Sequence, residues 1–291
     1  MTSRQILVSF IFFLFAACMV CPGHHAMQIS AQFPLFKVEI PDSLLKRNSN
    51  VVISSANGKL CVDPYEYSDC SSVKEVVVEE GIESIGEYAF LGCTSLESII
   101  LPSTLKEIGE GAFRDCTSLK RLEIPSGVKA GPAYMCAWDE NLESVTLPEG
   151  LEDIGRNAFA YCESLREIDF PESLVHIGPN AFSFCKSLEE VVLPDSIGEL
   201  ESYAFSGCES LERVKLPGND KMLGELLFTG CPSLRIVECM SVEPPTFDCD
   251  TPPFDPSETE LWQECLLIVP EGSKSRYMTA SGWKFFSKFV E

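Results

Sequence analysis

The amino-acid sequence predicts a repeat solenoid, a fold in which similar coils stack along one axis. Three observations lead to this prediction: one phrase recurs eight times at a spacing of 23 residues, a cysteine marks nearly every copy, and a leucine follows three residues later. A constant period of this length is typical of stacked repeats, because each unit buries its apolar side only against its neighbours. The marking residues are Cys70, Cys93, Cys116, Cys162, Cys185, Cys208 and Cys231, and Leu96, Leu119, Leu142, Leu165, Leu188, Leu211 and Leu234.

In each copy we expect a short strand followed by a turn and a return segment. After Cys93, the alternating apolar residues from Leu96 to Leu101 predict a strand with one buried side. Pro102 ends this strand, because proline cannot donate the next ladder hydrogen bond. Gly109 would permit a tight bend, and Ala112-Phe113 would point inward. About eight residues remain for the return, so it should be a short helical turn or extended, not a long helix.

Two copies depart from the phrase. In the fourth, Asp139 stands at the cysteine position, Met135-Cys136 replaces Ala-Phe, and Ala130–Pro132 occupies the turn. In the seventh, Gly218–Asp220 follows the strand where an apolar turn residue is expected. We expect a local bulge or a change of curvature at these places.

The chain divides into four predicted segments. Residues 1–26 are a signal peptide, 27–60 an N-terminal cap, 61–240 an array of eight coils, and 241–291 a C-terminal cap. An end coil exposes the edge of its core unless another segment covers it, so caps are expected at both ends. Within the first cap, Val51–Ile53 and Asn57-Gly58 predict a strand and a turn.

The C-terminal cap opens with a proline-rich loop from Glu243 to Pro253. Leu266–Val269 predicts a last strand, ended by proline. Ser273 would then cap a terminal helix. The aromatic residues of this region predict a hydrophobic plug rather than a ligand cage, and they are Tyr277, Trp283, Phe285 and Phe286.

The first 26 residues have the pattern of an export signal, because Arg4 precedes an apolar run, Ile6–Ala17, that is too short to span a bilayer. Two cleavage alternatives remain open. His24–Ala26 ends in a small residue, as for an ordinary secretory peptidase. Phe15–Cys18 resembles a bacterial lipobox, in which Cys18 would become lipid-modified and anchor the mature chain.

The charge of the chain is strongly acidic, with a formal net charge of −22 at pH 7. A nucleic-acid partner would need a clustered basic face, so we expect none. The apolar share of 45% is ample for a core that grows along the stack.

Fourteen cysteines in an exported chain suggest disulfides at first sight. Seven of them share one repeat position, however, and neighbouring coils about 4.8 Å apart leave their Cβ atoms farther apart than the roughly 3.8 Å of a disulfide. We therefore expect buried free thiols in this column. The disulfide candidates lie off the column, with no connectivity assigned: Cys61, Cys136, Cys239, Cys249 and Cys265.

The phrase Ile-Gly-x-x-Ala-Phe-x-x-Cys-x-Ser-Leu-x-x-Ile-x-Leu-Pro, read from Ile85 to Pro102, resembles the BspA-like leucine-rich repeats of surface proteins from Bacteroides-type bacteria. The resemblance covers about Cys61 to Met240. It implies a leucine-rich-repeat β-sheet solenoid in an exported, surface-displayed protein. Some members of the family are adhesins for host matrix proteins or other bacteria. The motif is specific for fold and weak for function, and it brings no catalytic motif.

Catalytic and metal chemistry find little support in the sequence. His176 is the main candidate base, but its repeat equivalents are charged residues of a solvated turn, and no second histidine is placed to activate a nucleophile. The thiols, 23 residues apart, do not resemble a zinc site. The acidic loop that could hold calcium matches no calcium motif, and it contains Asp248, Asp250, Asp255 and Glu258. We expect no enzyme activity, no cofactor and no metal.

The strand face is the candidate binding surface, because stacked strands form an extended sheet and solenoids bind partners on such surfaces. Both charge signs are interspersed along it, which suits a salt-sensitive contact with a protein or glycan. Plain solubility is the alternative explanation for its polarity. The candidate residues are Lys120, Arg121, Glu143, Arg166, Glu167, Glu189, Glu190, Glu212 and Arg213.

The sequence therefore predicts an exported, non-catalytic binding or adhesion protein that is either secreted or anchored at the cell surface by a lipid. Its partners would be host matrix or other bacterial surfaces, and it would touch a membrane only through that anchor. The alternative is a structural spacer or assembly subunit of a cell-surface complex, which would associate through its ends.

Overall fold

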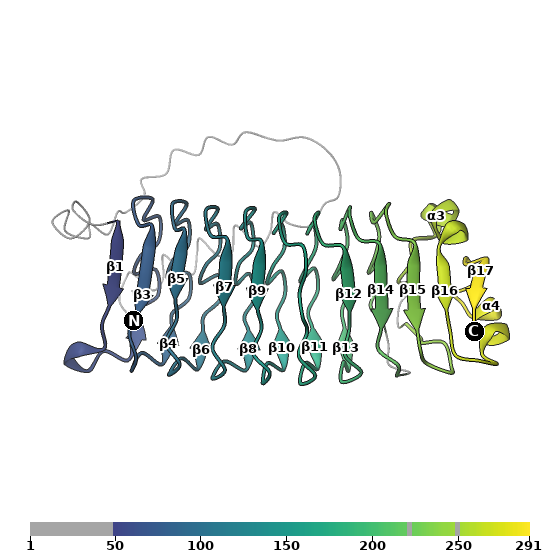
Figure 1. The fold of residues 1–291 in the computed structure, drawn as a ribbon, viewed down its shortest axis with the longest axis horizontal. Coiled ribbons are helices and arrows are strands. Elements are labelled where there is room, and N and C mark those ends of the chain that lie inside the picture. Colours follow the sequence, from purple (N-terminus) through teal and green to yellow (C-terminus); the bar gives the residue numbers. More distant parts are fainter. Residues whose placement is uncertain (1–48, 220–222, 248–250) are drawn as a thin grey trace, which may run out of the picture. The chain divides into compact units, whose positions relative to one another are not determined.

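The computed structural model describes residues 49–219, 223–247 and 251–291. They form a β-solenoid of about 10 turns with coils of roughly 23 residues, in which short strands lie side by side in two rows (Figure 1). The predicted solenoid and coil length are therefore confirmed. The predicted signal peptide, with Cys18, lies outside the described residues. Within the ranges given above, no helix is long and apolar enough to cross a membrane.

The front row is the line of strands that the leucine pattern predicts. In the strands of the repeats a buried residue alternates with more exposed ones, as Leu122 lies between Arg121 and Glu123. Strands of the repeats that pair do so in parallel at a 23-residue offset, so Leu122 faces Val145 of the next coil. The front row contains β1 (Asn50–Ile53), β3 (Glu75–Val78), β5 (Ser98–Ile100), β7 (Arg121–Glu123), β9 (Ser144–Thr146), β12 (Glu190–Val192), β14 (Arg213–Leu216), β15 (Ile236–Cys239), β16 (Leu266–Ile268) and β17 (Lys288–Val290).

The front row extends into both segments that were expected to cap the array. At the N-terminal end, β1 pairs with β3 over four residues. At the other end, β16 pairs with β15 and β17 pairs with β16. These terminal segments therefore continue the hydrogen-bonded row of the repeats, which explains why the stack has more turns than the eight copies of the phrase.

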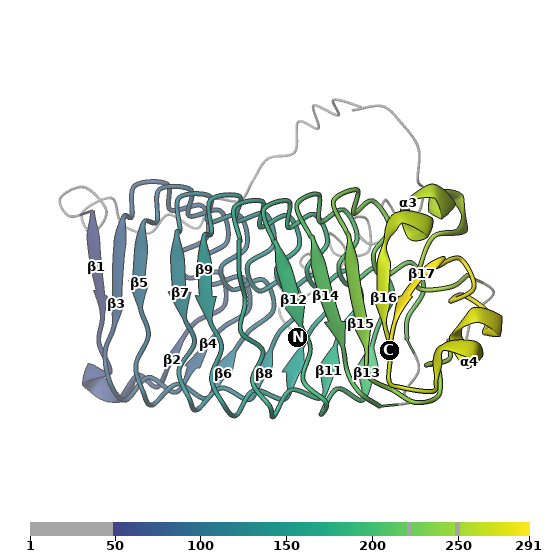
Figure 2. The same ribbon diagram turned by 45° about the vertical axis from the view of Figure 1, so that its right-hand side comes forward.

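A second row of strands, which the sequence did not reveal, runs through the predicted turn. Its strands are only two residues long, too short to show a period of two. Except between β6 and β8, neighbouring strands of the row pair in parallel, as Asp153 pairs with His176. Figure 2 shows this row and the return segments behind the front row. The second row contains β2 (Cys61–Val62), β4 (Ser84–Ile85), β6 (Glu107–Ile108), β8 (Ala130–Gly131), β10 (Asp153–Ile154), β11 (His176–Ile177) and β13 (Glu199–Leu200).

The repeat glycine serves close packing between coils, not the bend that was predicted for it. Gly109 has no positive φ, but a Cβ at this position would lie 2.4 Å from the backbone nitrogen of Glu87. The same conflict arises at Gly86, Gly155 and Gly224, where the nearest backbone nitrogen would lie 2.4–2.8 Å away. A side chain is excluded because the preceding coil occupies its place.

The tight bends occur instead at two left-handed positions in each return segment, and these positions also recur every 23 residues. One of them is Tyr88, with φ of 53°, and the other is Asp115, with φ of 60°. This conformation suits glycine, asparagine and aspartate and is rare for bulky residues. The return segments are therefore chains of turns, in agreement with the expectation that no long helix would fit.

The core lies between the two rows and the return segments, and it is built from columns of equivalent residues. Leu96, Leu119 and Leu165 are all fully buried. The phenylalanine rings stack between coils, with centroids 5.2 Å apart for Phe159 and Phe182. Each such aromatic pair contributes about 0.5–1.5 kcal/mol beyond the area that it buries. The shared ridge of leucines that the solenoid requires is thus present.

The cysteine column holds free thiols, as expected, but the thiols are also hydrogen-bond donors. Cys116 Sγ donates to the carbonyl of Phe90 at 3.2 Å, and Cys185 Sγ donates to that of Phe159 at 3.3 Å. Among the disulfide candidates, Cys61, Cys136, Cys239 and Cys265 are free. A bond between Cys239 and Cys265 is therefore absent, and Cys249 lies outside the described residues.

Strand pairing is interrupted close to the fourth copy, where we expected a local bulge or a change of curvature. The second row breaks between β6 and β8 and the front row between β5 and β7, and Cys136 takes the ring position between Phe113 and Phe159. In the seventh copy the front row continues through β14. Its unusual turn is tied to the previous coil, because Asn219 Nδ2 donates to the carbonyl of Ile197 at 2.8 Å. A break that was not predicted occurs where Arg166–Asp169 forms no strand.

Among the described residues, the two α-helices lie at the C-terminal end, and they are α3 (Thr259–Glu264) and α4 (Lys274–Thr279). Two short 3-10 helices also occur, η1 (Ala56–Gly58) near the N-terminal end and η2 (Pro256–Glu258) directly before α3. The predicted plug is observed, since Tyr277, Trp283 and Phe286 are buried. Phe254 lies among them, 5.2 Å from Trp283. Burial of these rings against one another closes this end of the core.

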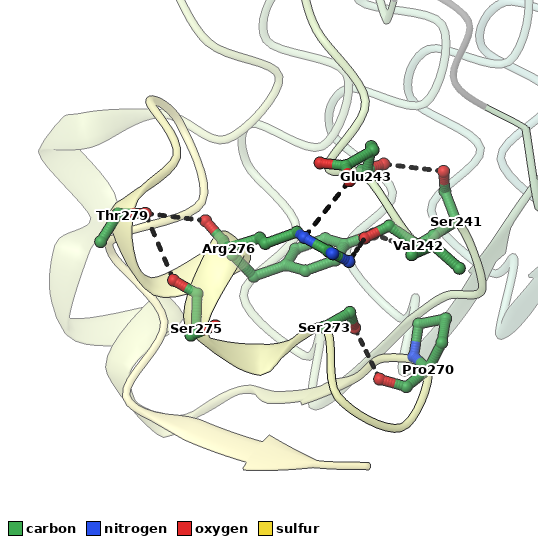
Figure 3. Close-up of polar contacts among 9 residues, drawn as sticks. Ser241, Val242, Glu243, Pro270, Ser273, Ser275, Arg276 and Thr279 are labelled. Atoms are coloured by element: carbon green, nitrogen blue, oxygen red, sulfur yellow. Dashed lines mark hydrogen bonds and ion pairs between the residues drawn. The ribbon is translucent and has the colours of Figure 1, made fainter.

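Helix α4 is held to the loop after β15 by polar contacts (Figure 3). Arg276 Nε lies 3.2 Å from a carboxylate oxygen of Glu243, and Tyr277 donates to the carbonyl of Ser241 at 2.7 Å. Ser273 is the N-cap residue of this helix, as predicted, but its side chain makes no capping hydrogen bond, because its hydroxyl donates backwards to the carbonyl of Pro270 at 2.6 Å. The hydroxyl therefore forms its hydrogen bond within the turn before the helix and not with the first turn of the helix.

Candidate functional site

Seven of the nine residues that were predicted to form the binding surface lie in a front-row strand or directly before one. The pleat of each short strand turns one side chain inward and its neighbours outward. Arg121 and Glu190, for example, flank the buried Leu122 and Val191. Arg166 and Glu167 lie where the row has no strand, and all nine candidate side chains are exposed.

Four of the nine candidates form ion pairs between neighbouring coils. Lys120 lies 3.7 Å from Glu143, and Arg213 lies 3.4 Å from Glu190 and also pairs with Glu238. The partners stand 23 or 25 residues apart, because equivalent positions of adjacent coils are neighbours. Exposed pairs of this kind contribute at most about 1 kcal/mol each. Their role is to balance charge within the face, which favours a structural explanation for these four residues.

The other candidates have no such partner. Within the described ranges, the guanidinium groups of Arg121 and Arg166 form no hydrogen bond and no ion pair. The carboxylates of Glu167, Glu189 and Glu212 are likewise unpaired there. These five side chains are therefore the part of the predicted face that is available to a ligand without first breaking an internal contact.

An apolar row on the same face was not among the candidates. Val52, Val77 and Ile100 lie side by side on β1, β3 and β5, and their exposed fractions are 60%, 36% and 62%. Later copies place Glu123, Thr146 or other residues at this position. The sequence does show the row, as three apolar residues in successive coils at a position whose side chains point outward. It was missed because each coil contributes only one of them.

His176 lies in strand β11 and is not the solvated turn residue that was expected. Its Nδ1 is 2.5 Å from Asp153 Oδ2 and its Nε2 is 2.7 Å from Glu201 Oε1. Burial lowers the pKa of His176, but its hydrogen bonds to the two carboxylates and their charges outweigh burial, so the pKa is raised from 6.5. With both ring nitrogens engaged by carboxylates, the ring offers no free lone pair to act as a general base.

The acidic loop of the C-terminal segment uses its side chains for local structure. Asp255 accepts from Ser257 N at 2.8 Å and from the Thr229 hydroxyl at 3.2 Å, while Glu258 accepts from Gly230 N at 2.9 Å. Asp248 and Asp250 lie outside the described residues. In the part of the chain that the structure describes, no group of three or more histidine, cysteine or acidic residues is placed to hold a metal ion.

The return side carries an aromatic stack that the sequence reasoning missed. The rings of Trp138 and Tyr161 are 5.5 Å apart, and those of Tyr161 and Phe184 are 4.7 Å apart. The Arg114 guanidinium covers the outer face of Trp138 at 4.4 Å. Trp138, Tyr161 and Phe184 occupy a left-handed position that holds aspartate or glycine in other coils. The signal was their 23-residue spacing. Both faces of Trp138 and Tyr161 are therefore covered, whereas Phe184 has a stacked ring on one face and is 38% exposed.

The comparisons with known proteins agree on the repeat. A model of the BspA type leucine rich repeat region matches in six copies over residues 61–137 and 132–243. No curated protein matches.

Three solved structures are similar to this chain. A leucine rich repeat protein of T. pallidum is 28% identical, with 64% of this chain and 78% of that chain covered and a TM-score of 0.46. A leucine rich cell surface protein from Faecalibacterium prausnitzii is 21% identical, with 82% and 78% covered and a TM-score of 0.48. A leucine-rich repeat protein from Bacteroides ovatus is 23% identical, with 78% and 73% covered and a TM-score of 0.44.

Proposed function

The chain belongs to the BspA-type leucine-rich repeat family, and on that premise we propose that it is an exported, non-catalytic binding or adhesion protein. Its ligand is a protein or glycan that docks on the exposed face of the front row. Proteins built from stacked repeats bind partners on such extended surfaces, and the one described histidine is held between two carboxylates instead of being available to a substrate.

The observation that carries the proposal is a pair of arginines, Arg121 and Arg166, that have no ion-pair partner among the described residues, on a face where Lys120 and Arg213 are paired. Arg121 and Arg166 stand two coils apart, close to the paired Lys120 and Glu143. Both side chains are exposed, so a ligand can reach their guanidinium groups without breaking an internal ion pair. Arginine suits planar acidic groups, because its guanidinium donates in a fork.

The test is a binding screen in which the charge of the front face is changed without touching an existing ion pair. Wild-type chain and the double variant Arg121→Glu/Arg166→Glu are immobilised and exposed to arrays of purified matrix proteins and glycans. The matched control is Lys129→Glu/Arg156→Glu, which makes the same change at exposed residues away from the front face. We expect a ligand of the wild type to be retained by the control and lost or weakened by the front-face variant, most clearly at low salt.

Equal retention by both variants would reject the front face as the binding surface. If no ligand is retained and light scattering instead shows a mass that rises with concentration, the protein is a structural spacer or assembly subunit. Charge reversal at Glu190 is unsuitable for this test, because it would also break the contact with Arg213.

Export and anchoring form the second part of the proposal, and they rest on the sequence of residues 1–26. Mass spectrometry of the mature protein distinguishes the two processing alternatives. Cleavage after Ala26 gives an unmodified N-terminus, whereas lipidation gives an N-terminal Cys18 carrying acyl groups. A mature chain that retains Met1 in its native host would contradict both.

A further inference from the structure

His176 joins three consecutive coils in the second row. Its ring lies between Asp153 on β10 and Glu201 directly after β13, with nitrogen–oxygen distances of 2.5 Å and 2.7 Å. The side chain of His176 is only 25% exposed. The three residues come from three different turns of the solenoid, so their contacts link coils that are otherwise held here by two-residue strands.

The geometry requires a particular protonation state. A neutral imidazole has one N–H group and one lone pair, whereas the imidazolium ion has two N–H donors. Both ring nitrogens of His176 face acceptor oxygens within hydrogen-bond distance. Only the imidazolium can donate to both carboxylates, and loss of its proton would turn one of the two contacts into a repulsion between lone pairs.

A departure from the repeat points to the same contact. Glu201 stands in the glycine column, which holds Gly86, Gly109, Gly155, Gly178 and Gly224 because a Cβ there would meet the preceding coil. Glu201 keeps the backbone hydrogen bond of that position, from its N to the carbonyl of Ile177 at 2.9 Å. The coil thus accepts a side chain where close packing favours none, and that side chain is the one that reaches His176.

We propose that Asp153, His176 and Glu201 form a proton-dependent clamp between coils, closed while His176 is an imidazolium ion and opened on one side when the ring loses its proton. The charged residues on the two strands next to His176 are all acidic, namely Asp153 with Glu152 before it and Glu199 with Glu201 after it. No basic residue of these strands competes with the ring. The clamp strengthens the stack in mild acid and weakens it as the pH rises.

The sign follows from the raised pKa of His176. A histidine whose pKa is higher in the folded than in the unfolded chain contributes stability that is complete below the unfolded value of about 6.5. This contribution disappears as the pH rises through the folded value. The window therefore begins near neutral pH and extends above it, so alkaline conditions open the clamp.

Two measurements on the full chain test the clamp. The first is the NMR titration of the His176 ring, assigned by the signal that is absent from His176→Gln. We expect a midpoint above the ordinary value of about 6.5, a lower midpoint in Glu201→Gly, and a smaller change in the control Glu199→Gln, which removes a nearby carboxylate that does not contact the ring. Glu201→Gly restores the repeat residue, so this variant should fold.

The second measurement is hydrogen exchange, expressed as protection factors so that the intrinsic effect of pH on exchange is removed. The amides of Gly178 and Glu201 report on the clamp, and those of Gly86 and Gly109 make the equivalent hydrogen bonds in coils without it. Between about pH 6 and pH 8.5, we expect protection at the clamp to fall by up to about tenfold per pH unit, with little change at the control amides.

The expected loss of protection should be absent in His176→Gln. A His176 midpoint at or below 6.5, or an equal response to pH at the clamp and control amides, would overturn the proposal.

Discussion

Replacing Asp139 by cysteine should stabilise the protein. Asp139 stands where seven other copies have cysteine, and it is fully buried. Its Oδ1 accepts from Cys116 N at 2.7 Å, but its Oδ2 has no hydrogen-bond partner among the described residues. In the neighbouring coil, the equivalent Cys116 thiol donates to the carbonyl of Phe90. Asp139→Cys would remove the unpaired oxygen and supply a donor of the repeat type.

The expected gain follows from the hydrogen bonds. An unsatisfied polar group in a protein interior costs about 1–3 kcal/mol. The bond that the substitution loses is inexpensive, because Cys116 N also donates to the carbonyl of Phe113 at 3.2 Å. We therefore expect Asp139→Cys to raise the free energy of unfolding at neutral pH by about 1–3 kcal/mol.

The pH dependence separates charge from hydrogen bonding. Burial raises the pKa of Asp139 well above 3.8, although the hydrogen bond from Cys116 lowers it. The folded chain therefore holds this proton more tightly than the unfolded chain does, and folding loses stability as the pH rises from about 3.9 through the folded pKa. Asp139→Asn cannot ionise but keeps an unpaired polar group, so its advantage over the wild type should grow with pH.

The assay is equilibrium unfolding in urea at several pH values, for the wild type, Asp139→Cys and Asp139→Asn. Transition midpoints are compared only where the slopes agree, because a repeat array can unfold in parts. The reasoning fails if Asp139→Cys is less stable than the wild type at neutral pH. It also fails if the difference between Asp139→Asn and the wild type is the same at all pH values.

Three further predictions concern the packing between coils. Gly109→Ala should destabilise the chain by about 1–3 kcal/mol, because the new Cβ would lie 2.4 Å from Glu87 N. The control Gly198→Ala should be nearly neutral, because its Cβ would meet only Val175, at 3.5 Å from the side chain and 3.7 Å from the backbone oxygen. Thermal unfolding of the two variants measures the difference. Phe182→Ala removes a ring whose centroid lies 5.2 Å and 5.4 Å from those of its stacked neighbours. It should lower the free energy of unfolding in urea by about 3–5 kcal/mol. A decrease below about 1 kcal/mol would contradict the column of stacked rings. Burial raises the pKa of the Cys93 thiol to about 12. Iodoacetamide at about pH 8 should therefore alkylate the partly exposed Cys61 and spare Cys93 until the chain unfolds. Peptide mapping by mass spectrometry measures the labelling, and early labelling of Cys93 would show that its coil opens.

The repeat period predicted most of the fold because the same residue type returns wherever coils contact each other. Leu96 and Phe113 could be assigned to the core from one copy of the phrase, and both are fully buried. Gly109 was expected to permit a tight bend, and this reason for the glycine was wrong. The sequence shows that a side chain is avoided there, but only the distance to Glu87 in the preceding coil shows whether a bend or a close approach is the cause.

The candidate site was harder to predict, because an outward column looks the same whether its charges are paired or free. Lys120 and Arg121 are adjacent in sequence and equally exposed. Only the stack of coils shows that Lys120 meets Glu143 while Arg121 has no partner in the described part of the chain. The row of Val52, Val77 and Ile100 was missed for a related reason: it spans three strands, and each strand alone shows a single ordinary apolar residue.

The same reasoning shows where function should be sought in this chain. In a solenoid each column sets the residue that packing prefers, so a departure from the column is informative in a way that a single unusual residue in an irregular fold is not. Asp139 in the cysteine column has an unpaired oxygen and should cost stability. Glu201 in the glycine column has a partner, His176, on the preceding coil. A departure that leaves a group unpaired is drift that the neighbouring coils tolerate, whereas a departure that creates a contact between coils is a candidate for a selected property.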